Sequence, residues 1–91
     1  MTEIVLKLIL LRYNMLSKRE STAAHMCLQA GENMYYNAEW SECVDEMIEI
    51  RNDLRKHGYE LVYADVKTAG KIEYDVYKIV LINDYGFGNN A

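Results

Sequence analysis

Apolar residues fill both sides of the first segment of the chain, residues 4–13. In an extended strand one face would be wholly apolar, and the other would be interrupted only by Lys7. In a helix, four polar residues would share one side: Glu3, Lys7, Asn14 and Ser17. Periodicity does not decide between the two for so short a run. We predict a strand, because the C-terminal third supplies two strands and a two-stranded sheet is marginal in water.

Helical spacing follows the polar connector at residues 17–22. Apolar and small residues then recur at steps of three and four, at Ala23, Cys27, Ala30, Met34 and Ala38. They predict a first helix that is capped by Ser21 or Thr22 and weakened in its middle by Gly31. A second helix should begin at Ser41 or Asn37, and its apolar stripe holds Trp40, Cys43, Val44, Met47, Ile50 and Leu54. It should end at residues 55–58, where basic residues suit the helix dipole and Gly58 suits a left-handed cap.

The C-terminal third alternates with a period of two. Two such runs, at residues 59–66 and 72–82, flank the glycine-bearing stretch "KTAGK" and predict a hairpin. We therefore predict an α+β fold of order β-α-α-β-β, with a three-stranded, mainly antiparallel sheet and two helices on one face. A single domain should span residues 1–84, followed by a flexible tail at 85–91.

A sheet covered on one face leaves apolar residues on its other face. An uncovered patch of this kind marks a partner surface, and a second copy of the chain is the simplest partner. We therefore expect a homodimer whose contact face holds Val5, Ile9, Leu11, Tyr13, Tyr77 and Ile79.

Composition places the chain among ordinary globular proteins, since 51% of its 91 residues are hydrophobic and 26% are charged. Two cysteines do not make the disulfide framework of a small secreted domain, so we expect both to be reduced core residues. The opening apolar run contains Lys7, lacks a cleavage site and is too short to cross a bilayer. We expect a soluble, cytoplasmic protein that does not bind membranes.

Patterns for catalysis or cofactor binding fail on spacing. His25 and Cys27 lie two positions apart, which is not the spacing of a structural zinc site. Cys43 and His57 would be separated by fourteen residues of helix, or roughly 21 Å. "TAGK" lacks the second glycine and the following hydroxyl of a phosphate-binding loop, and "GFG" opens no helix. We expect no enzyme activity, no metal and no cofactor.

Negative charge is concentrated in one segment of the chain. Residues 32–53 hold seven carboxylates and one base, a net charge of −6, whereas the remaining residues sum to +2. Six of these carboxylates form an acidic stripe on the second predicted helix: Glu39, Glu42, Asp45, Glu46, Glu49 and Asp53. One interpretation is a solvated face whose early acids suit the helix N-terminus. The other is a strip that docks onto a larger protein with a basic surface.

A solvated face is the commoner role of a run of like charges, and the sequence leaves both interpretations open. As the function of the chain we predict a non-enzymatic protein-interaction module that docks partly through this stripe. Its partner could be a nucleic-acid-handling enzyme, with the carboxylates in place of phosphates. In size, acidity, tyrosine content and lack of catalytic motifs, the chain resembles phage- or plasmid-encoded inhibitors of host defence. The negative net charge of the chain disfavours direct binding of nucleic acid. The alternative function is nevertheless a small nucleic-acid-binding regulator, which would use a basic-aromatic face of the hairpin: Lys67, Lys71, Tyr74 and Lys78. A structural subunit of a larger assembly is a third interpretation.

Overall fold

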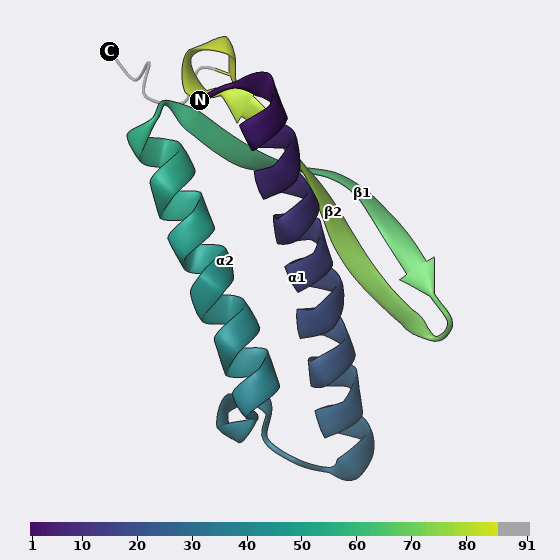
Figure 1. The fold of residues 1–91 in the computed structure, drawn as a ribbon. Coiled ribbons are helices and arrows are strands. Elements are labelled where there is room, and N and C mark those ends of the chain that lie inside the picture. The colour runs from purple at the N-terminus through teal and green to yellow at the C-terminus, as the bar shows by residue number, and fades with distance from the viewer. Residues whose placement is uncertain (86–91) are drawn as a thin grey trace.

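Two long helices pack beside a twisted β-hairpin (Figure 1). The computed structural model describes residues 1–85. The element order is α1 (Glu3–Ala30), η1 (Met34–Tyr36), α2 (Ala38–Lys56), β1 (Tyr59–Ala69), β2 (Ile72–Leu81) and η2 (Ile82–Tyr85). The α+β class is confirmed. The flexible tail predicted at 85–91 falls, apart from its first residue, outside the described residues.

The prediction of a strand at residues 4–13 is wrong, because this segment forms the first part of α1. The sheet therefore has two strands and not three. The Thr2 side chain caps α1 by accepting a hydrogen bond from the Val5 amide. The polar connector at 17–22 does not interrupt the helix, since Thr22 Oγ1 donates to the Lys18 carbonyl within the same helix.

α1 ends at Ala30 and is capped by Gly31, whereas the sequence pattern predicted a helix that continued through Gly31 to Ala38. Gly31 has a φ of 69°, a left-handed conformation that a residue with a side chain rarely adopts. The backbone amides of Gly31 and Glu32 bond back to the carbonyls of Leu28 and Cys27, which satisfies the last turn of the helix.

Polar side chains of α1 form hydrogen bonds with the backbone along the edge of β2. Asn14 accepts a hydrogen bond from the Tyr77 amide at 2.9 Å and donates one to the Tyr77 carbonyl at 3.2 Å. Ser17 donates to the Asp75 carbonyl at 2.7 Å. Asn14 and Ser17 are two of the four polar residues that would share one side if residues 4–13 were helical. Because α1 bonds this edge and packs on the hairpin, two strands suffice.

The second helix and the hairpin form where the sequence predicted them. Asn37 caps α2 by accepting a hydrogen bond from the Trp40 amide, and the left-handed Gly58 follows its last turn. The strands pair antiparallel from Tyr59 opposite Leu81 to Ala69 opposite Ile72, with an irregularity between Tyr63 and Asp65. The turn is shorter than predicted, because β1 continues through Ala69.

The core lies where the two helices meet the start of the hairpin. Tyr13, Leu54 and Leu61 form its buried cluster, and Tyr13 meets the Tyr77 ring edge-on at 5.1 Å. From there the hairpin runs along α1 on the side away from α2 (Figure 1). The molecule is therefore elongated, 46 Å by 26 Å by 24 Å, and one broad side of the helix pair is not covered by the hairpin.

The six residues expected at a dimer contact do not share a surface. Tyr13 is buried, while Ile9, Tyr77 and Ile79 pack against the core. Val5 and Leu11 are exposed on the outside of α1. The physical reason is the helical conformation of residues 4–13, in which alternate positions point in different directions.

Candidate partner-binding surface

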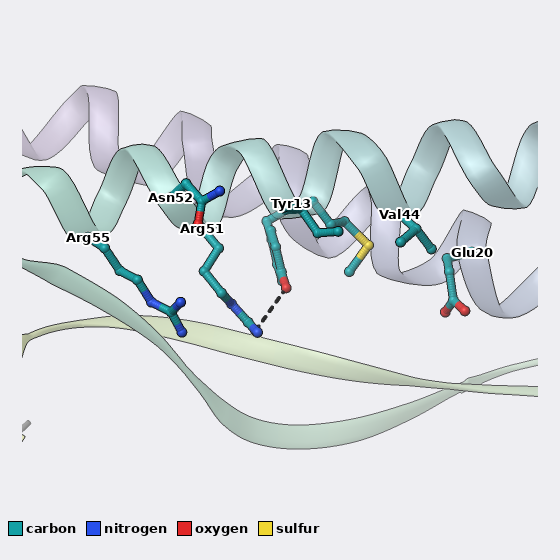
Figure 2. A pocket seen from close by; sticks show the side chains of 8 residues that line it. Tyr13, Glu20, Val44, Arg51, Asn52 and Arg55 are labelled. Carbon is teal, nitrogen blue, oxygen red and sulfur yellow. Dashed lines mark hydrogen bonds between the residues drawn. The ribbon is translucent and has the colours of Figure 1, made fainter.

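The six carboxylates of the acidic stripe follow α2 on the sides that face neither the core nor the hairpin. Cys43 and Leu54 point into the packed interior of the fold. Val44, Arg51 and Arg55 line a cavity that opens toward the hairpin (Figure 2). Because these five residues take up the inner and hairpin sides of α2, helical spacing turns the carboxylates to the remaining surface.

Arginines of α1 compensate two members of the stripe. Arg12 donates two hydrogen bonds to the Glu46 carboxylate, at 2.6 and 2.8 Å. Arg19 bonds Glu39 at 2.7 and 3.0 Å. The hydrogen bond from Arg12 holds the pKa of Glu46 below its usual value. These two carboxylates therefore join α1 to α2, and the stripe is not uncompensated along its whole length.

The other four carboxylates remain open to solvent, and we call them the open carboxylates: Glu42, Asp45, Glu49 and Asp53. Within residues 1–85, the side chains of these four make no ion pair and no hydrogen bond. Each lies three or four positions from the next, so the like charges repel by a few tenths of a kcal/mol per pair. The open carboxylates are thus the part of the stripe that a partner could bind.

The alternative Lys/Tyr face is partly assembled by the hairpin. Cross-strand pairing sets Lys67 opposite Tyr74, and Lys78 lies four positions further along β2, so these three side chains share one face. Glu73 and Asp75 alternate to the other face. Lys71 lies next to the turn, away from this group.

Tyr74 is not a free stacking surface. Its side chain is half-buried, and the Lys18 ammonium of α1 lies 5.9 Å from its ring centre. This contact adds a cation to the face but occupies one side of the ring, on which a nucleic-acid base would otherwise stack.

A cavity of about 370 Å³ is lined by residues of α1 and α2, on the side of the helix pair that faces the hairpin (Figure 2). Arg51 donates to the Tyr13 hydroxyl at 3.1 Å, and Arg55 donates to Glu60 at 2.8 Å. Burial raises the pKa of Tyr13. This network was missed by the sequence analysis, because its partners lie as far as 38 positions apart. Its cations are held by Glu60 and Tyr13, so we assign it to the packing of the hairpin on α2.

The cysteines, the possible metal ligands and the long helices can now be assessed in the structure. Cys27 and Cys43 are buried and free of any disulfide. Burial raises the pKa of the Cys43 thiol. In the described part of the chain, no group of three or more His, Cys, Asp or Glu could hold a metal ion. Among residues 1–85, no helix is both long and apolar enough to cross a bilayer.

Comparison with models of protein families, with curated proteins and with solved structures finds no match for this chain. Its function is therefore inferred from its own residues.

Proposed function

We propose that this protein is a non-enzymatic interaction module that binds a larger protein through the open carboxylates of α2. The observation that carries the proposal is the contrast within one stripe. Glu39 and Glu46 are neutralised by arginines of the same molecule, whereas Glu42, Asp45, Glu49 and Asp53 are not. A stripe that served solubility alone would more often interleave lysines among its acids.

The charge pattern indicates a partner with a basic surface. From Glu42 to Asp53 the open carboxylates extend over eleven helical steps, or roughly 16 Å. A rigid row of anions of this length raises the rate of encounter with a cationic groove and selects that partner against others. A groove that normally holds nucleic-acid phosphates has the required charge. Occupying it would make the protein an inhibitor, as for the anti-defence proteins of phages and plasmids.

Reversing three of the open carboxylates tests this proposal. The variant Glu42→Lys, Glu49→Lys and Asp53→Lys changes the net charge by +6 and leaves the Arg12–Glu46 and Arg19–Glu39 pairs in place. A matched control, Glu32→Lys with Glu73→Lys and Asp75→Lys, makes the same change at exposed positions off the stripe. Tagged forms of all three proteins are used to capture partners from a host lysate at low and moderate salt.

We expect wild type and the control to retain the same partner, and the stripe variant to lose it. Binding by wild type should weaken as salt rises, because exposed charges are screened. Equal capture by the stripe variant would contradict a role for the open carboxylates. Capture that does not change with salt would contradict an electrostatic interface.

A small nucleic-acid-binding regulator is the second candidate, and the hairpin register favours it. The pairing places Lys67, Tyr74 and Lys78 together and turns Glu73 and Asp75 away. In a mobility-shift assay with single-stranded oligonucleotides, this function requires a complex that Lys67→Glu weakens. The absence of a shift for wild type at moderate salt would remove this candidate.

A further inference from the structure

The outward side of α1 carries apolar residues that have no partner in the fold. We call them the outer stripe: Ile4 (72% exposed), Leu8 (61%), Leu11 (60%) and Met15 (49%). Their spacing of four, three and four residues is that of a coiled-coil seam, in which large apolar residues of one helix insert between those of another. The stripe begins one residue after the start of α1 at Glu3, and the helix continues beyond it to Ala30.

The outer stripe is not part of the hydrophobic core. Tyr13 and Leu16, which point to the opposite side of α1, are 3% and 1% exposed. The stripe forms a patch on the order of 400 Å² per copy, at the size that marks an interaction site. A stable dimer buries about 800 Å² on each partner, and the polar residues beside the seam could supply the rest.

Charges of opposite sign flank the outer stripe. On the hairpin side lie Lys18, above the Tyr74 ring, and Lys7, near β2. The Lys7 ammonium lies 3.6 Å from Glu3 in an exposed ion pair of the same helix, and such pairs contribute little, so Lys7 can exchange Glu3 for a carboxylate of another chain. On the α2 side lie Arg12 and Arg19, but both are neutralised by their carboxylate partners. The open carboxylates come next on α2. The seam therefore separates a cationic flank from an anionic one.

We propose that the outer stripe binds the outer stripe of a second copy, with the two α1 helices parallel and the two-fold axis along them. This symmetry exchanges left and right, so α2 of each copy lies over the Lys7–Lys18 flank of the other. The Arg12–Glu46 and Arg19–Glu39 pairs set the heights of the two helices. At those heights Lys7 lies level with Glu49 and Asp53 of the second copy, and Lys18 with Glu42.

Charge argues against the other occupants of this face. In an antiparallel pair, α2 would lie over α2 of the second copy, and the open carboxylates of the two chains would repel one another. An anionic membrane would meet the same carboxylates beside the stripe. Three of the open carboxylates, Glu42, Glu49 and Asp53, face the second copy in this dimer, so the dimer and the partner of the proposed function compete for them. Leu8→Glu leaves all four carboxylates in place and separates the two proposals, because it should weaken the dimer without weakening capture of the partner.

Sedimentation equilibrium of the purified protein tests the dimer at concentrations up to roughly 100 µM, since interfaces of this size range from micromolar to picomolar affinity. Leu8→Glu should raise the dissociation constant at least about tenfold, because it places two carboxylates face to face in an apolar seam. The matched control is Leu28→Glu, at a residue of α1 that is 77% exposed but lies off the stripe. A monomer throughout, or equal effects of the two variants, would overturn the proposal.

Orientation is tested by crosslinking with a short bis-maleimide. In the parallel dimer Ile4→Cys should crosslink to itself, whereas in an antiparallel one it should crosslink only to Met15→Cys in a mixed sample. Wild type is the control, since Cys27 and Cys43 are buried.

A charge reversal tests the contact between Lys18 and Glu42 of the second copy. Lys18→Glu should weaken the dimer, and the double variant that also carries Glu42→Lys should restore it. The antiparallel crosslink, or no rescue, would overturn the parallel arrangement. Vesicles of anionic lipid should not bind.

Discussion

Replacing Asn14 with alanine tests how α1 substitutes for a third strand. The Asn14 side chain bonds both the amide and the carbonyl of Tyr77, in a half-buried position at the edge of β2. Alanine removes the side chain that bonds both groups, and so leaves the amide and the carbonyl of Tyr77 without this hydrogen-bond partner.

The expected loss follows from these two bonds. Each hydrogen bond contributes about 1 kcal/mol, and a buried group left unpaired costs about 1–3 kcal/mol. Partial burial favours the lower values, so the total is about 2–3 kcal/mol. Alanine also gains about 0.5 kcal/mol of helix propensity over asparagine, which would mask part of the loss.

Asn52→Ala is the matched control, because Asn52 is exposed on α2 and should gain the same propensity without losing a bond. Both variants are unfolded with urea and followed by circular dichroism and by the fluorescence of Trp40. For a chain of this size, with a slope of about 1 kcal/mol per molar urea, Asn14→Ala should unfold about 2 M earlier than the control.

A difference of less than about 0.5 kcal/mol between Asn14→Ala and Asn52→Ala would refute the reasoning, since surface changes usually fall within that range. It would mean that the edge of β2 finds other partners and that α1 contributes to the sheet by packing alone. Ser17→Ala gives a second reading, because it removes one bond to the Asp75 carbonyl and should cost about 1 kcal/mol.

Three further predictions concern stability and reactivity. Since hydrogen bonding from Arg12 lowers the folded-state pKa of Glu46, the pair stabilises the fold above the unfolded pKa of Glu46, and this contribution is lost as pH falls through the lower folded value. A carboxyl titration by NMR should show the Glu46 midpoint rising in Arg12→Gln, and an unchanged midpoint would contradict the pair. Leu54→Ala should cost about 2–5 kcal/mol in urea unfolding, because Leu54 is fully buried; a loss under 1 kcal/mol would contradict the core. Cys43 should react with iodoacetamide only after denaturation, as checked by mass spectrometry.

Local signals were enough to predict α2 and the hairpin. Asn37 bonds a backbone amide three positions away, and Gly58 adopts its left-handed conformation directly after the last turn. From Tyr59 onward apolar and polar residues alternate, and this period of two predicts the strands directly. Such signals act within a few residues, so they can be read along the chain without knowing what packs against it.

Local signals do not determine the conformation of residues 4–13. Their sequence establishes that both sides are apolar, but a strand buried on both faces and a helix with an exposed seam satisfy the same pattern. The bonds from Asn14 to Tyr77 span 63 positions. Only packing against β2 determines that the segment is helical and that Leu8 and Leu11 remain outside.

The sequence by itself placed six carboxylates along one helix, because helical geometry fixes how residues three and four apart are arranged. The tertiary structure decided which of them are open to a partner. Arg12 and Arg19 lie 34 and 20 positions from the carboxylates they bind, and only the antiparallel packing of α1 on α2 brings them together. Charge along a helix is a local property, but its neutralisation depends on contacts between segments distant in the chain.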